Sequence, residues 1–143
     1  VAMSHGVTFL GAHSWREVRP GRGFVVRAYF TVAAPMKGRW EGRIIARDEE
    51  GREAFTYTHP VSEGAVPPQT WPPGRVIVDE TVVRPPLDVP EGKYSLLWVL
   101  VERDSKETAM PEPQAPPDVE GVYIGDIRVT PEALPGVAGL AWS

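Results

Sequence analysis

Three histidines are the side chains of this chain best suited to metal binding or proton transfer near neutral pH. They are His5, His13 and His59, and no two of them stand at the i, i+2 or i, i+4 spacing of a local ligand pair. The chain has no cysteine, so it has no thiolate metal site and no disulfide. We therefore predict no metal and no cofactor, although a fold could still bring His13 and His59 together with a carboxylate.

Carboxylates and serines are the other side chains of this sequence that could be catalytic. Asp79 and Glu80 are adjacent, and on a strand they point to opposite faces, so they cannot flank one glycosidic bond. Asp118 and Glu120 share a face of an extended segment, but calcium needs more oxygen ligands than two. No serine lies in a Gly-x-Ser-x-Gly turn. The sequence predicts that the chain is not an enzyme.

The composition is that of one globular domain. The chain has 143 residues and a net charge of −4, which gives no support for a nucleic-acid partner. No apolar run approaches the about 18 residues of a membrane span, so we expect no transmembrane segment. We expect a disordered start or cloning remnant over 1–6, a folded domain over 7–130 and a C-terminal tail over 131–143. The first residue is valine, which favours a piece of a longer protein.

Seven segments have the pattern of β-strands. They alternate apolar and polar residues, or are apolar throughout, and turn-forming glycines and prolines separate them. Their expected ranges are 7–13, 23–32, 39–48, 53–58, 75–83, 93–103 and 121–130. A glycine in the last segment, Gly125, favours a β-bulge there. No window shows a convincing helical period.

The segment from Val89 to Val101 fixes the architecture. A turn containing Pro90 and Gly92 precedes Tyr94, and an apolar run follows. This arrangement is typical of the tyrosine corner, in which the phenol hydroxyl bonds back to the chain just upstream. We therefore predict an all-β fold, a seven-stranded immunoglobulin/fibronectin-III-like β-sandwich with a tyrosine corner.

Four short motifs in order carry a resemblance to a known family. They are Val18-Arg19-Pro20-Gly21, Trp71-Pro72-Pro73-Gly74, the stretch from Val89 to Leu96, and Ile124 to Val129. The chain resembles the β-sandwich at the extracytoplasmic C-terminal end of bacterial polytopic membrane glycosyltransferases and related surface proteins. The resemblance implies an accessory module outside the cytoplasm, with the chemistry carried by the membrane-embedded part of such enzymes.

One candidate surface is the outward face of the tyrosine strand. If Tyr94 and Trp98 face the core, the outward residues in the middle of this sheet are apolar. They are Ile45, Leu97, Val99 and Val101. Such a patch indicates a partner, namely another protein domain or a second copy of the chain. The alternative is that a loop such as Met110 to Pro117 covers it.

Loop aromatics form the second candidate site. Trp71 lies in a proline-rich loop and Tyr57 on a strand, and both could stack on a sugar ring, with Trp15 as a further candidate. Trp71 could equally close one end of the sandwich. The sequence thus predicts a non-catalytic accessory or interaction module of a larger surface protein. A carbohydrate-binding module is the alternative, and an enzyme built from distant loops is a third possibility that requires a deep polar pocket.

Overall fold

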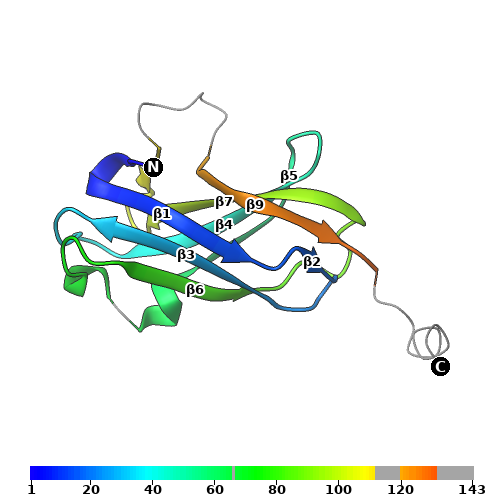
Figure 1. The fold of residues 1–143 in the computed structure, drawn as a ribbon, viewed down its shortest axis with the longest axis horizontal. Coiled ribbons are helices and arrows are strands. Elements are labelled where there is room, and N and C mark those ends of the chain that lie inside the picture. Colours follow the sequence, from blue (N-terminus) through cyan, green and yellow to red (C-terminus); the bar gives the residue numbers. More distant parts are fainter. Residues whose placement is uncertain (66, 112–119, 132–143) are drawn as a thin grey trace.

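A computed structural model shows a sandwich of two β-sheets (Figure 1), and it describes residues 1–65, 67–111 and 120–131. The smaller sheet has the order β1-β3-β6, formed by Val7–Ser14, Phe24–Val32 and Ile77–Val83. The larger sheet has the order β2-β9-β7-β4-β5, with β8 paired to β7. Its strands are β2 (Glu17–Val18), β4 (Trp40–Arg47), β5 (Glu53–Pro60), β7 (Gly92–Glu102), β8 (Thr108–Ala109) and β9 (Val122–Val129). The predicted all-β sandwich is confirmed.

Three short 3-10 helices complete the described elements. They are η1 (Ser4–Gly6), η2 (Val61–Gly64) and η3 (Pro68–Thr70). Helix η2 follows β5 of the larger sheet and packs against β6 of the smaller one, so it closes one edge of the sandwich. In the described part of the chain, no helix has the length and apolar character needed to span a membrane.

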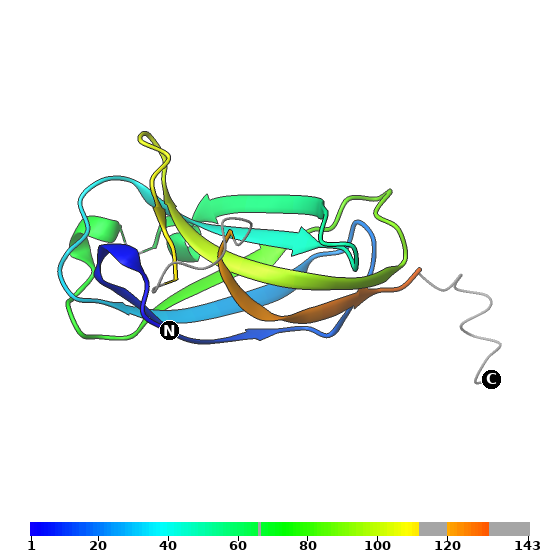
Figure 2. The ribbon, with the colours of Figure 1, turned by 90° about the horizontal axis from the view of Figure 1, so that it is seen from above.

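The core follows from the alternation of side chains along the strands. On β3 every second residue from Phe24 to Val32 is buried, and on β6 the same holds from Ile77 to Val83. Figure 2 shows the two sheets stacked on each other. Aromatic rings pack between them. The ring centroid of Phe30 lies 5.3 Å from that of Trp98 and 5.2 Å from that of Trp71. These contacts join the smaller sheet, the larger sheet and the proline-rich loop.

The tyrosine corner is formed as predicted. The Tyr94 hydroxyl donates a hydrogen bond of 2.6 Å to the carbonyl oxygen of Pro90. Burial raises the pKa of this phenol, so it remains a donor across the neutral range. The bond ties the start of β7 to the turn before it, and β7 then pairs with β4 on one side and β9 on the other.

The bulge predicted near Gly125 is also present. Tyr123 pairs with Leu97 and Gly125 with Leu96, so Ile124 is the extra residue on β9. Gly125 has a φ of +132°, a conformation that favours glycine because it has no Cβ. The bulge changes the course of β9 where this strand passes beside β1 (Figure 1).

The N-terminal residues differ from the disordered start that we expected. The Val1 ammonium donates to the Phe9 carbonyl at 2.7 Å, and Met3 is buried and bridges to Pro111. Backbone hydrogen bonds from Met3 to Val7 and from Ser4 to Met110 hold the turn. Residues 1–6 therefore pack as part of the sandwich. Apart from its first residue, the predicted tail over 131–143 lies outside the described residues.

Candidate functional sites

The predicted partner surface is buried within the chain. Its four side chains form a hydrophobic cluster separate from the main core, consisting of Ile45, Leu97, Val99 and Val101. Met110, at the start of the predicted covering loop, packs against this cluster. The prediction of an exposed apolar face is therefore corrected, because these side chains have less than a tenth of their area in contact with solvent. The remainder of that loop, residues 112–119, lies outside the described residues.

The two predicted glycan contacts are not placed on an open surface. Trp71 is 0% exposed and packs edge-on against Phe30, so its ring closes the end of the core and cannot stack on a sugar. Tyr57 is half-buried and stacks on His59 at 5.4 Å between centroids. The closing role, which the sequence left open for Trp71, is the one that the structure shows. The Trp15 side chain, in contrast, is 55% exposed.

A buried polar network lies between the sheets. Nε2 of His59, on β5, lies 2.9 and 2.7 Å from the two carboxylate oxygens of Asp79, on β6. The indole N–H of Trp98 donates to the same carboxylate at 3.0 Å. The Ser62 backbone N–H donates to it at 3.1 Å. Asp79 therefore accepts hydrogen bonds from β5, η2 and β7. These bonds explain how a carboxylate can be buried in the core.

No substrate has room at this network. His59 and Asp79 are each 1% exposed. A Cβ added to Gly42 would lie 2.2 Å from an Asp79 oxygen and 2.6 Å from His59 Nε2, so only glycine fits opposite the pair. The Nδ1 atom of His59 is buried without a hydrogen-bond partner among the described residues. A His–Asp pair that solvent cannot reach serves as a link between the layers rather than as a catalytic dyad.

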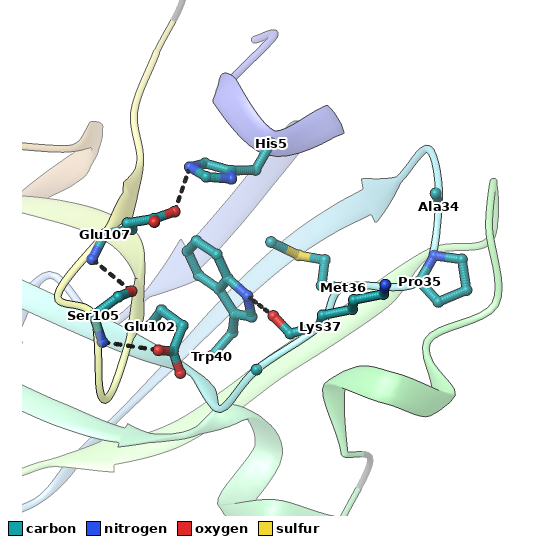
Figure 3. Close-up of a pocket in the computed structure, with 10 residues that line it drawn as sticks. His5, Ala34, Pro35, Met36, Lys37, Trp40, Glu102, Ser105 and Glu107 are labelled. Atoms are coloured by element: carbon teal, nitrogen blue, oxygen red, sulfur yellow. Dashed lines mark hydrogen bonds and ion pairs between the residues drawn. The ribbon is translucent and has the colours of Figure 1, made fainter.

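A hollow of about 480 Å³ lies at the end of the molecule that carries η1 (Figure 3). Trp40 lies between the loop of Met36 and Lys37 and the turn that follows β7. Its indole N–H donates to the Lys37 carbonyl at 2.9 Å, and the His5 ring packs 4.9 Å from it. Nε2 of His5 lies 3.6 Å from a carboxylate oxygen of Glu107 at the rim.

Glu102 also lines this hollow, and its carboxylate oxygens already accept hydrogen bonds within the chain. Hydrogen bonds from the backbone N–H groups of Ser105, Arg39 and Asp104 lower the pKa of Glu102 to about 2. A carboxyl group with this pKa is ionised at neutral pH and cannot act as a general acid. Its role is to join the loop before β4 to the turn between β7 and β8.

The part of the chain that the structure describes contains no group of three His, Cys, Asp or Glu side chains close enough together to hold a metal ion. His13 and His59 belong to different regions, since His13 is exposed near the end of β1 and His59, on β5, is buried between the sheets.

Comparison with known proteins gives similarity in structure but not in sequence. No family model and no curated protein matches the chain. The fold is similar to the C-terminal domain of wzt, with a TM-score of 0.62 and 12% identity over 92% of this chain and 77% of that one. What the two share is the fold.

Two further solved structures are similar at a lower level. The Niemann-Pick type C2 protein of the Japanese carpenter ant has a TM-score of 0.49 and 8% identity over 87% of this chain and 91% of its own. The CARDB domain of the PF1109 protein of Pyrococcus furiosus has a TM-score of 0.46 and 11% identity over 88% and 94%.

Proposed function

We propose that this chain is a non-catalytic, immunoglobulin-like accessory module of a larger surface or membrane-associated protein. One observation carries the proposal: the His–Asp pair of the described core, His59 with Asp79, is sealed from solvent and occupied by structural hydrogen bonds. Two carboxylates that line surface hollows are likewise engaged: Glu102 by backbone N–H groups, and Asp126 by Lys93 and the Tyr123 hydroxyl. In this proposal the module binds a partner, and any catalytic activity belongs to another part of the larger protein.

Two similarities support this proposal. The motifs from Val18 to Val129 resemble accessory sandwiches outside the cytoplasm in bacterial membrane glycosyltransferases. The similarity in fold to the C-terminal domain of wzt is to a domain at the end of a longer protein. Both are consistent with a partner that is a protein domain or a second copy of the chain.

A screen for turnover tests the non-catalytic part. The purified chain is incubated with chromogenic esters, phosphates and glycosides, and a heat-denatured sample serves as the control. We expect equal rates in both. Turnover by the folded chain alone, lost in a folded variant of a surface residue such as Glu107→Gln, would overturn the proposal.

Size-exclusion chromatography with light scattering tests for the second copy. A mass that rises with concentration from one chain to two supports self-association. A strictly constant single-chain mass leaves a different protein domain as the partner, and co-purification with the parent protein's remaining segments then identifies it.

Carbohydrate binding is a second candidate function, and one observation favours it. Trp15 presents 55% of its side chain to solvent in the bend between β1 and β2, whereas Trp40, Trp71 and Trp98 are buried. An exposed indole offers a flat apolar face on which the C–H groups of a sugar ring can pack. A glycan array probed with the chain and with Trp15→Ala tests this, and retention of no glycan above background would end it.

A further inference from the structure

Three surface hollows lie next to one another near the end of β1, and Trp15 lines two of them. The largest has a volume of about 620 Å³ and is bounded by the end of β1, Arg16 and the middle of β9. The second, of about 300 Å³, shares His13 and Ser14 with it and also touches Trp15. The third, of about 270 Å³, continues from Trp15 toward the start of β3. The first and second hollows share lining residues, as do the second and third, and we call the three adjoining hollows together the Trp15 groove.

The groove lies where the chain passes from one sheet to the other. Strand β1 belongs to the smaller sheet, and β2, two residues later, pairs in parallel with β9 of the larger sheet. Figure 1 shows β1 and β9 running side by side toward this end of the molecule. The Arg128 backbone N–H donates to the Arg16 carbonyl at 2.7 Å, so the two arginines are fixed beside each other.

The charge of the Trp15 groove is opposite to that of the chain. The whole chain carries a net charge of −4. Two acidic residues, Glu17 and Asp126, line the groove. The basic residues that line it number six: Arg16, Arg19, Arg22, Arg27, Lys93 and Arg128. Such segregation produces a local positive potential that attracts anions.

Several of these charges already have partners. Lys93 lies 3.3 Å from Asp126, and Asp126 also accepts from the Tyr123 hydroxyl at 2.8 Å. Arg27 pairs with Glu80. Arg19 donates to the Pro131 carbonyl at 2.8 Å.

Arg16 and Arg128 are different from these cations. Both are exposed, and neither guanidinium has an ion-pair partner among the residues that the structure describes. A guanidinium group presents a fork of N–H donors that matches a carboxylate or a sulfate. The two arginines can therefore contact an anionic group without first breaking an existing pair.

We propose that the Trp15 groove binds an acidic glycan. A sugar ring stacks on the exposed Trp15 indole, and the carboxylate or sulfate groups of neighbouring sugars pair with Arg16 and Arg128. This inference rests on the second candidate function, carbohydrate binding, and adds the class of glycan and the contacts. Single-stranded nucleic acid is the competing polyanion, but its binding surfaces stack successive bases on several aromatic rings. Among the described residues that line the groove, Trp15 is the single exposed tryptophan, tyrosine or phenylalanine, because Phe24 is buried.

Isothermal titration calorimetry at low salt tests the inference with four probes. They are a hexamer of galacturonate, a heparin-derived hexasaccharide, neutral cellohexaose and a twelve-residue oligo-dT. We expect at least one acidic hexasaccharide to bind more tightly than cellohexaose and oligo-dT. Binding should weaken as salt is added, because exposed ion pairs are screened.

Variants locate the contacts. Trp15→Ala should weaken binding of the acidic hexasaccharide roughly tenfold or more, since exposed aromatic anchors dominate such contacts. Arg16→Gln with Arg128→Gln should weaken it by a similar factor and flatten its salt dependence. Arg75→Gln removes an exposed arginine near the start of β6, away from the groove, and should leave it unchanged. Circular dichroism confirms that each variant is folded.

Each other outcome overturns the inference in a distinguishable way. Trp15-dependent binding of cellohexaose that equals or exceeds that of the acidic probes keeps carbohydrate binding and removes the acidic preference. Tighter binding of oligo-dT identifies the groove as a nucleic-acid surface. Binding of no probe, or binding unchanged in Trp15→Ala, removes the groove as a glycan site and leaves the accessory-module proposal standing.

Discussion

His59 and Asp79 join the two sheets through hydrogen bonds of 2.7 and 2.9 Å between one imidazole nitrogen and both carboxylate oxygens. The histidine comes from β5 at the edge of the larger sheet and the aspartate from β6 at the edge of the smaller one. Because Trp98 donates to the same carboxylate, the network also reaches the middle of the larger sheet. It is a polar link in a core that is otherwise held by apolar contacts.

Loss of this carboxylate should destabilise the fold strongly. In Asp79→Ala the N–H groups of His59 and Trp98 lose their acceptor in a buried site, and we expect a cost of about 3 kcal/mol or more. Urea-induced equilibrium unfolding measures it. Asp88→Ala, at an exposed loop position, is the matched control and should change stability by less than about 0.5 kcal/mol. Equal stabilities of the two variants would contradict the structural role.

The tyrosine corner should contribute a smaller but measurable amount. Tyr94→Phe removes the hydroxyl that donates to the Pro90 carbonyl and keeps the ring, so we expect a loss of about 1 kcal/mol. Tyr123→Phe removes a hydroxyl from a ring that is 58% exposed and should cost less. Thermal and urea unfolding of both variants compare the two hydroxyls directly. Unchanged stability of Tyr94→Phe would show that the corner bond adds nothing.

Lysine substitutions test whether the outward cluster of the tyrosine strand is covered in solution. Val99→Lys and Leu97→Lys place an ammonium group among buried apolar side chains, and we expect each to cost about 3 kcal/mol or to prevent folding. Thr56→Lys lies on the same sheet at an exposed position opposite Ile45 and should be tolerated. Circular dichroism and urea unfolding give the comparison. Folded, equally stable Val99→Lys would mean that the cluster is open and available to a partner.

Glu102 should contribute a distinct acid sensitivity. Its pKa is about 2 in the folded chain, below the ordinary glutamate pKa of 4.5, so its contribution to stability is present above pH 4.5. That contribution is lost as the pH falls from 4.5 toward 2, because the unfolded chain takes up the proton first. We therefore expect the difference in stability between the wild type and Glu102→Gln to shrink across this range.

Urea unfolding at pH 6 and pH 3 measures this difference. Glu49→Gln replaces an exposed glutamate in the turn before β5 and should show the same pH profile as the wild type. A constant gap between the wild type and Glu102→Gln at both pH values would show that folding does not lower the pKa of Glu102.

Much of the fold could be predicted because it depends on local patterns. The alternation along β3, the turn before Tyr94 and the glycine at the β9 bulge each specify their own structure within a few residues. Strands β2 and β8 were missed because two residues are too few to show a period. They exist because partners distant in the sequence supply the hydrogen bonds.

The sites were harder to predict because burial depends on what lies opposite a strand. The pattern correctly placed Leu97 and Val99 on the outward face, but it could not show that Met110 packs over their cluster. Trp71 lies in a loop, yet its ring turns inward onto Phe30. Asp79 alternates with Ile77 and Thr81 on the core-facing side of β6, and an aspartate at such a position indicates a buried polar network. Nothing in the sequence, however, paired Asp79 with His59.

The position of the Trp15 groove has a consequence for how the chain folds during synthesis. The groove needs both ends of the sequence, since Arg19 and Pro131, 112 residues apart, are joined beside it and β2 pairs with β9. Contacts so distant in sequence close only after the intervening strands have formed or been synthesised. During translation, a ribosome must therefore release almost the whole domain before the Trp15 groove can form, and a product truncated before β9 would carry the tryptophan but no groove around it.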